Sequence, residues 1–383
     1  MSESKLFIFK IQLETMVEKI VLITGPSGCG IMDKLIEVAD LAEMEGIKLK
    51  VIRVFDYMKK IDPQLREETV LSRERKWLLE IRRKAINLIS KDISSSKKQG
   101  PKYFLIKTAL KYWWHGEVIS GLTHGEFGQL KPSMIITLID DIFRVKRRLA
   151  EDPQWRDQPF SLRDLAWLRA EEISTARHLF AEAYHLKHYL VAVDHPTRVL
   201  YDLIVHPEKP VIYLSYPVTG LTKDEKEEQR KMLSEFEKRV SSKYIVLDPL
   251  TIHEGIILSV LREAGKKGKG PNDLVKFSVR YRSTGLEQFE YRVRELKDCL
   301  DLVIRQIVDR DQYMVETSDI VIFYNPKGKP SEGATVELFW GSKMGKRTYV
   351  FRPPGLYSPF STASAEKIFE KEEDLLRELS IVV

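Results

Sequence analysis

An acidic side chain stands just beyond a turn of small residues in the stretch 331–338, SEGATVEL. The turn follows a predicted strand, 320–324, and leads into a predicted helix, 335–344, whose first turn carries Glu337. A carboxylate there is also stabilised by the helix dipole, so Glu337 alone has a purely structural interpretation. The glycine-rich approach nevertheless predicts that Glu337 lies at the carboxyl end of a parallel sheet, where open α/β folds bind ligands.

A second candidate site is the glycine-rich loop 25–30, GPSGCG, which follows an apolar run and precedes a helical pattern. It matches the phosphate-binding pattern G-x-x-x-x-G-K-[ST] up to the sixth position, and the residues expected to surround a phosphate are Gly25, Ser27, Gly28 and Gly30. Ile31 then stands where the pattern has lysine, and Met32 where a hydroxyl would hold magnesium. Backbone N–H groups of the loop can still bind an anion, but the groups that assist phosphoryl transfer are missing.

Strands and helices alternate along the first half of the chain. Strands are predicted at 20–24, 50–54, 103–107, 133–139 and 190–193, and helices at 33–45, 67–91 and 162–187, with a basic helix after Asp140. This alternation indicates a mostly parallel sheet with helical crossovers. His178, His185 and His188 fall on the last helix, but no carboxylate pattern accompanies them, so no metal site is predicted.

A polar, proline-bearing stretch, HPEKP at 206–210, interrupts this pattern. Beyond it the pattern restarts, with strands predicted at 211–215, 244–247, 320–324 and 348–351 and helices at 223–240, 286–308 and 335–344. The stretch 250–286 between them is predicted to be a long connection. We therefore predict two α/β domains, residues 1–207 and residues 208–383, the second being the smaller.

Composition narrows the class of protein. The chain has 383 residues, of which 43% are hydrophobic and 31% charged, as in a globular protein of two domains. No apolar run reaches the about 18 residues of a membrane span, and the first ten residues, MSESKLFIFK, lack a signal-peptide pattern. Two cysteines provide neither a disulfide framework nor a zinc site, so a cytoplasmic location is expected.

The charge pattern excludes little by itself. The net charge of +6 is modest for this length, so nucleic acid is not an expected partner. Only three asparagines occur beside many lysines, arginines and glutamates, a bias that is typical of thermophilic sources.

The first half resembles the archaeal adenylate kinase-like P-loop family over roughly residues 18–195. The resemblance is carried by loop 25–30, VFDYM at 54–58, the charged helix after Asp62-Pro63, and RVKRRLAEDPQWRD at 144–157. In that family an acidic strand end follows the second crossover, whereas the equivalent place here, IKTALKYWWH, has no acidic residue. The resemblance therefore implies a degenerate P-loop domain that binds a nucleotide, and it implies ATP and magnesium only if this domain is active.

The second half resembles the nucleoside 2-deoxyribosyltransferases and the related 2′-deoxynucleoside 5′-phosphate N-glycosidases, over roughly residues 210–352. Tyr213 matches the tyrosine of the first strand, and Asp311 precedes Asp319 by the eight residues of the family pattern. Glu337-Leu338, followed by Gly345-Lys346, matches the helix and its exit. Ser331 resembles the phosphate-hydrolysing branch, because the transferases usually have aspartate there. The implied architecture is a flavodoxin-like, doubly wound sheet following the P-loop kinase-like sheet.

The resemblance implies a role for each matched residue. Glu337 would be the nucleophile that attacks C1′, and Asp311 the acid that protonates the departing base. Tyr213 would hold Glu337 in place. The residues expected to bind the substrate, including its 5′-hydroxyl or 5′-phosphate, are Ser331, Gly333, Ser215 and Gly220. No cofactor is required for this reaction, and the family implies a homo-oligomer.

The chain departs from the family in its phosphate-binding loop. Loop 216–220, YPVTG, lacks the serine and arginine that the phosphate hydrolases use, and Arg280 and Arg282 are the predicted replacements. The sequence thus predicts N-glycosidic bond cleavage or transfer on a nucleoside or its 5′-monophosphate. Two alternatives stay open: a non-catalytic nucleotide-binding regulator, and a divergent nucleoside monophosphate kinase.

Overall fold

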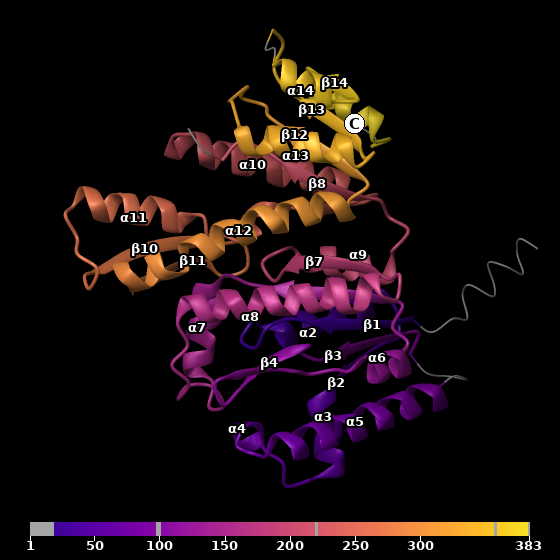
Figure 1. The fold of residues 1–383 in the computed structure, drawn as a ribbon. Helices are drawn as coiled ribbons and strands as arrows, with labels where there is room; N and C mark the ends of the chain where they lie inside the picture. Colours follow the sequence, from indigo (N-terminus) through magenta and orange to yellow (C-terminus); the bar gives the residue numbers. More distant parts are fainter. Residues whose placement is uncertain (1–18, 97–100, 219–220, 356–357, 382–383) are drawn as a thin grey trace, which may run out of the picture. The chain divides into compact units, whose positions relative to one another are not determined.

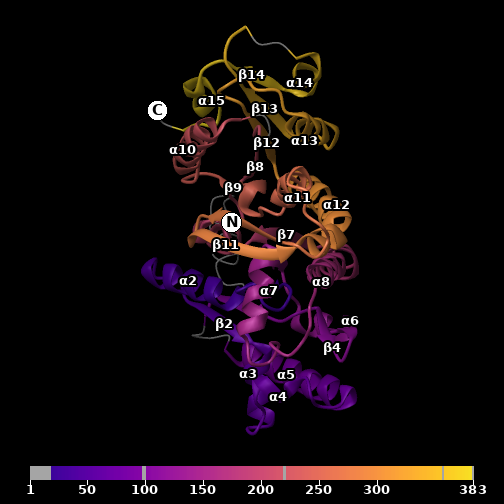
Figure 2. The same cartoon turned by 90° about the vertical axis from the view of Figure 1, so that its left-hand side faces the viewer.

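The computed structural model describes residues 19–96, 101–218, 221–355 and 358–381, and Figures 1 and 2 show its helices and strands. The chain forms two compact units, each discontinuous in sequence. Unit 1 comprises the chain up to Val193 together with 256–278 and 288–302, and unit 2 comprises 194–255, 279–287 and 303–383. The predicted fold class, α/β with two domains, is confirmed. The predicted boundary between residues 207 and 208 stays a prediction.

Unit 1 is built on a five-stranded parallel sheet in the order β2-β3-β1-β6-β7. Its strands are β1 (Lys19–Thr24), β2 (Leu49–Arg53), β3 (Tyr103–Lys107), β6 (Met134–Ile139) and β7 (Lys187–Ala192). Every residue of β6 is buried, as expected for a strand covered on both faces. The central strand, β1, ends at the glycine loop.

Helices connect and flank this sheet (Figure 1). They are α2 (Ile31–Met44), α3 (Val54–Ile61), α4 (Glu67–Val70), α5 (Arg75–Ser95), α6 (His124–Leu130), α7 (Ile142–Glu151), α8 (Leu162–Ser174) and the π-helix η1 (Thr175–Glu182). A two-stranded hairpin, β4 (Lys111–Trp114) and β5 (Glu117–Ser120), follows β3. The apolar face of α5 packs into the core with Leu78, Ile81 and Ile89.

Unit 2 has a second five-stranded parallel sheet, in the order β14-β13-β12-β8-β9. The strands are β8 (Val211–Ser215), β9 (Ile245–Leu247), β12 (Ile320–Tyr324), β13 (Arg347–Phe351) and β14 (Lys367–Phe369). Numbered along the chain, this is the order 2-1-3-4-5 of flavodoxin-like doubly wound sheets. Its topological switch point lies between β8 and β12, so the fold predicts a ligand site at their carboxyl ends.

The helical elements of unit 2 and of the segments next to it are as follows: α9 (Thr197–Val205), α10 (Lys223–Val240), η2 (Pro249–Thr251), α11 (Ile256–Lys266), α12 (Val293–Thr317), α13 (Glu332–Lys343), α14 (Pro359–Ser364) and α15 (Glu372–Glu378). By unit, α11 belongs to unit 1, and α12 contributes its first ten residues to unit 1 and the rest to unit 2. None of the helices in the described part of the chain combines the length and the apolar character needed to cross a membrane.

The two faces of the unit 2 sheet carry different helices. Ile212 and Leu214 share a core cluster with Phe236 of α10 and with Leu375 of α15. Because side chains alternate along a strand, Tyr213 and Ser215 point to the opposite face. That face is covered by α13, whose Gly341 packs directly on Val321 of β12. The alternation therefore directs Tyr213 and Ser215 toward the helix that carries Glu337.

Several predicted elements were wrong. The stretch 250–286 contains η2, α11 and the first strand of a hairpin, β10 (Leu274–Tyr281) and β11 (Gly285–Arg292), and the helix predicted from residue 286 begins at Val293. Alternating apolar residues in KFSVRY and a positive φ at Gly285, 78°, are the signals of this hairpin. The predicted helix 162–187 ends at Glu182, so His188 lies on β7 instead.

Close packing of α13 on the sheet yields a stability prediction. A Cβ at Gly341 would lie 2.6 Å from Cγ2 of the buried Val321, so Gly341→Ala requires the helix or the strand to shift. We expect a loss of about 1–3 kcal/mol in the free energy of unfolding, measured by urea denaturation. Gly333→Ala, in the same helix, is the control, because a Cβ there meets nothing within 4 Å. Equal effects of the two substitutions would contradict this packing argument.

Candidate functional site

The predicted catalytic glutamate lies beside the end of strand β8. The hydroxyl of Ser215, the last residue of β8, donates a hydrogen bond to the carboxylate of Glu337 on α13. α13 begins at Glu332, so Glu337 lies in its second turn rather than in the first turn that the sequence suggested. The helix-dipole explanation for an acid at this position is thereby weakened, because the dipole acts mainly on the first turn.

Burial changes the protonation of Glu337. Burial and, to a smaller extent, the nearby negative charge of Asp311 raise the pKa of the Glu337 carboxyl to about 7, although the hydroxyls of Ser215 and Tyr213 favour the ionised form. A carboxyl group with this pKa exchanges its proton near neutral pH. Such groups are characteristic of acid–base and nucleophilic chemistry.

Asp311, the second predicted catalytic residue, is paired with its neighbour on α12. Its Oδ1 accepts a hydrogen bond from Nε of Arg310 at 2.9 Å and forms an ion pair with Nη2 at 2.8 Å. Both residues are more than nine-tenths buried. Burial raises the pKa of Asp311, while Arg310 opposes the rise by stabilising the carboxylate.

The predicted tyrosine completes this cluster. Tyr213 is fully buried, and the charges of Asp311 and Glu337 add to burial in raising the pKa of its hydroxyl well above the usual value. Arg310 also lies within electrostatic range of Tyr213 and Glu254. The structure thus brings together Tyr213, Asp311, Glu337 and Ser215 at the switch point of the sheet.

Sequence reasoning missed Arg310. Its side chain is the cation that faces this group of acids, and burial would lower its pKa if Asp311 did not raise it. The only available signal was its position directly before Asp311 in the stretch DRD at 309–311. Helical periodicity does not show whether such an arginine faces solvent or the core.

The predicted substrate-binding residues on the turn have structural partners of their own. Ser331 is the N-cap of α13, where its hydroxyl accepts from the N–H of Ala334 at 3.3 Å. Gly333 is exposed, and nothing packs where a Cβ would be, so the turn is open to approach by a ligand. Gly220 lies outside the described residues.

The two arginines predicted to bind phosphate lie by a different cavity. Arg282 is held by ion pairs to Glu237, at 2.7 Å, and to Asp248. Together with the exposed Arg280 it lines a cavity of about 720 Å³, whose wall includes α10 residues such as Gln229 and Leu233. The structure does not bring these arginines together with Glu337 and Asp311 in one described cavity.

The glycine loop of unit 1 has the backbone conformation of an anion-binding loop. Gly28 and Gly30 adopt positive φ values of 80° and 71°, and a Cβ at Gly25 would lie 2.3 Å from the carbonyl oxygen of Leu138. Glycine is therefore required at these positions. The loop leads into the amino terminus of α2, whose first N–H groups have no partner within the helix.

Charged residues from other elements support this loop. Glu172 of α8 is fully buried and accepts hydrogen bonds from the N–H of Gly25 at 3.1 Å and of Leu110 at 2.8 Å. Arg148 of α7 donates to the carbonyl oxygen of Gly28 at 3.0 Å and to Asp140 at 2.7 Å. Sequence reasoning missed Asp140, although it directly follows the buried strand β6, which is the usual place for a functional acid in such sheets.

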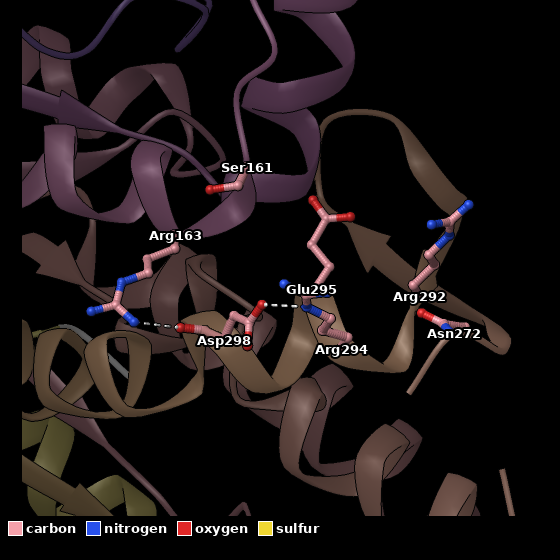
Figure 3. A pocket seen from close by; sticks show the side chains of 7 residues that line it. All are labelled: Ser161, Arg163, Asn272, Arg292, Arg294, Glu295 and Asp298. Carbon is pink, nitrogen blue, oxygen red and sulfur yellow. Dashed lines mark hydrogen bonds and ion pairs between the residues drawn. The ribbon is translucent and has the colours of Figure 1, made fainter. Parts of the chain in front are cut away.

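A cavity of about 370 Å³ adjoins the loop, and we call it the loop cavity. Its lining includes residues 25–33, Arg53, Arg82, Lys107 and Trp155. A third cavity of about 320 Å³ is shown in Figure 3, where Arg163 donates to the carbonyl oxygen of Asp298 at 3.4 Å. None of the predicted site residues lines that cavity. No group of three or more histidine, cysteine or acidic side chains in the described residues is placed to hold a metal ion.

Comparisons with known proteins find similar architecture only. No protein-family model and no curated relative matches the sequence. Similar solved structures include a shikimate kinase from Bacteroides thetaiotaomicron, with 12% identity and a TM-score of 0.31 over 57% of this chain and 98% of that chain. A Clostridium botulinum CMP N-glycosidase, BcmB, has 15% identity and a TM-score of 0.23 over 44% of this chain and 97% of its own.

A 2-deoxyribosyltransferase from Bacillus psychrosaccharolyticus has 16% identity and a TM-score of 0.25 over 45% of this chain and 96% of that chain. These scores are too low to carry an argument about activity. The function proposed below therefore rests on the site residues themselves.

The raised pKa of Glu337 yields a prediction for stability against pH. Because the folded protein holds this proton more tightly than the unfolded chain, Glu337 lowers the free energy of unfolding as pH rises from about 4.5 to about 7. We expect Glu337→Gln to remove this loss and to be more stable than the unsubstituted protein at pH 8, by on the order of 2 kcal/mol. The advantage should vanish near pH 4.

Urea denaturation across this pH range measures the effect. Glu332→Gln is the matched control, because Glu332 is exposed in the same helix. A stability difference for Glu337→Gln that does not change with pH would show that the carboxyl is not buried as described.

Proposed function

We propose that unit 2 cleaves or transfers the N-glycosidic bond of a nucleoside, a deoxynucleoside or the corresponding 5′-monophosphate. The observation that carries the proposal is the meeting of two carboxyl groups, the partly buried Glu337 and the buried Asp311, at the switch point of the doubly wound sheet. Breaking an N-glycosidic bond develops positive charge at C1′ and negative charge on the base. One carboxyl group for each charge is the minimum that the chemistry requires.

In the proposed reaction the ionised Glu337 attacks C1′ while the bond from C1′ to the base nitrogen breaks. The electron pair of that bond stays with the base, and Asp311 donates its proton to the base. A glycosyl ester of Glu337 results. Asp311, now ionised, then takes a proton from water or from a second base, whose oxygen or nitrogen attacks C1′ and releases Glu337.

The reaction needs one proton on the pair of carboxyl groups. Arg310 favours the ionised form of Asp311, so in the free protein this proton resides mainly on Glu337. The proton must be on Asp311 when the base departs. The two groups therefore act as a coupled pair, and the pH dependence of the rate belongs to the pair rather than to either residue.

The neighbouring residues have supporting roles in this proposal. The hydroxyl of Ser215 holds the carboxylate of Glu337 toward the end of the sheet, and Tyr213 lies close to that carboxylate. Ser331 and the N–H groups of Glu332 and Gly333 would bind the 5′-hydroxyl or 5′-phosphate. The proposed reaction needs no metal or organic cofactor. We further propose that the protein is a cytoplasmic enzyme and acts as a homo-oligomer.

A second candidate is a nucleotide-binding regulator, favoured by the glycine loop of unit 1. The loop retains its positive-φ glycines and adjoins a cavity, yet the buried side chain of Ile31 stands at the lysine position of the pattern. These features suit binding without phosphoryl transfer. A divergent nucleoside monophosphate kinase would need ATP and magnesium, with its cation coming from elsewhere in unit 1.

Release of free base tests the proposal directly. Incubation with a panel of nucleosides and 5′-monophosphates, followed by chromatography, should show base release by the unsubstituted protein. Glu337→Gln and Asp311→Asn should each lower the rate by at least about a hundredfold, because each removes one of the two required groups. Tyr213→Phe should cost less, about tenfold, because Tyr213 acts through Glu337.

The outcomes separate the candidates. Tight nucleotide binding by calorimetry without base release would favour the regulator, and ATP-dependent formation of a diphosphate would favour the kinase. Base release that survives Glu337→Gln would refute the assignment of the nucleophile.

The coupled pair also predicts the pH profile. Because the reactive form holds one proton, kcat/KM should decline above about pH 7, where Glu337 loses the last proton. It should decline again at low pH, where Asp311 becomes protonated as well. Arg310→Gln removes a positive charge and should therefore move both limbs to higher pH.

Arg310→Lys keeps the charge and should move the limbs less, which separates an electrostatic effect from loss of packing. Circular dichroism of each variant checks that it is folded. Limbs that do not move in folded Arg310→Gln would contradict the role given to Arg310.

A further inference from the structure

Two basic residues lie side by side at the carboxyl edge of the unit 1 sheet. Arg53 ends β2 and Lys107 ends β3, and the two are paired in the parallel register of these strands. Like charges on adjacent strands repel, so this pairing costs stability in the absence of a counter-charge. The carboxyl edge of a parallel sheet is also where α/β folds bind ligands.

A third cation joins them from α5. The guanidinium of Arg82 donates to Thr108 Oγ1 at 2.8 Å and to the carbonyl oxygen of Gly121 at 2.7 Å, and it lies 5.1 Å from the ring centre of Tyr112. These partners are neutral, so they orient Arg82 without neutralising its charge. Arg82 is thereby fixed next to the end of β3.

Among the described residues, the acids nearby pair with Arg53 and not with Arg82 or Lys107. Glu67 and, at 3.8 Å, Asp56 both form ion pairs with Arg53. The carboxylate of Glu172 is occupied by backbone N–H groups, among them those of Leu110 and Lys111. Within the residues that the structure describes, the ammonium of Lys107 has neither a hydrogen bond nor an ion pair.

These interactions disfavour the charged form of Lys107. Burial lowers the pKa of its ammonium, and the charges of Arg53 and Arg82 lower it further. A partly buried ammonium without an ion pair is costly, and an anion placed against it would offset both the desolvation and the repulsion.

These three cations face a space that could hold such an anion. Arg53, Arg82 and Lys107 all line the loop cavity of about 370 Å³, together with the glycine loop. The cavity therefore has two places that attract negative charge: the N–H groups at the start of α2, and the cationic cluster at the ends of β2 and β3.

We propose that the cluster of Lys107, Arg53 and Arg82 is a binding site for a phosphate or carboxylate group of a small molecule held in the loop cavity. This site would complement the glycine loop, because it supplies the positive charge that Ile31 cannot. The proposal concerns unit 1 alone and does not depend on the reaction proposed for unit 2.

Thermal unfolding of the full chain tests the site. Inorganic phosphate and, in a separate arm, succinate are titrated against sodium chloride at matched ionic strength. An anion that binds only the folded protein should raise the midpoint of unfolding in proportion to its occupancy. The arm that stabilises more tells whether the group is a phosphate or a carboxylate.

Lys107→Met is the decisive variant. It should weaken binding of the preferred anion by at least about tenfold, which corresponds to about 1.4 kcal/mol, and in chloride alone it should be at least as stable as the unsubstituted protein. Lys50→Met is the matched control, because Lys50 is an exposed lysine on β2 that does not line the cavity. Its anion response should be unchanged.

Two results would overturn the proposal. The first is that neither anion stabilises the protein beyond chloride. The second is that Lys107→Met responds to the anion as strongly as Lys50→Met does. Calorimetric titration of the folded variants with the same anions provides an independent measure of affinity.

Discussion

The buried ion pair between Arg310 and Asp311 is the interaction on which the site of unit 2 depends. Removing a carboxylate from water costs several kcal/mol unless a cation and hydrogen bonds replace the water. Arg310 supplies both to Asp311, and its charge also acts on Tyr213 and Glu254. Among the described residues Glu337 has no ion pair, and burial beside Asp311 leaves its proton exchangeable near neutral pH. One arginine thus sets two different environments for two neighbouring acids.

Much of this site could be predicted from the sequence, because its parts follow local rules. Strand alternation places Tyr213 and Ser215 on one face, and a small-residue turn after a buried strand places α13 at the carboxyl end of the sheet. The strand order then brings these elements together. The role of Arg310 was not predictable, since tertiary packing decides which side of the long helix α12 is buried. The hairpin β10–β11 was missed although KFSVRY alternates, because the lysine- and glycine-rich stretch before it, REAGKKGKGP, favoured an exposed connection.

The same limit explains what was missed in unit 1. The glycines of the loop were recognisable because their positive φ values restrict the residue type locally. The cluster of Arg53, Arg82 and Lys107 near the loop was not recognisable, because these residues come from different elements. Their proximity depends on β3 lying between β1 and β2, which is a property of the sheet and not of any one segment. A motif search at position 31 therefore finds only a missing lysine.

The candidate sites of the two units have opposite imbalances of charge. Unit 2 gathers several acids around the single arginine Arg310, so its unmet need is for protons or for a substrate that develops positive charge. Unit 1 gathers Arg53, Arg82 and Lys107, of which only Arg53 has ion pairs among the described residues, so its unmet need is for an anion. The net charge of +6 is a sum over both units, so it indicates neither the acidic cluster of unit 2 nor the basic cluster of unit 1. In this chain, charges without a protein partner indicate function better than motifs do. An uncompensated buried charge lowers the stability of the fold, so its presence favours a functional role.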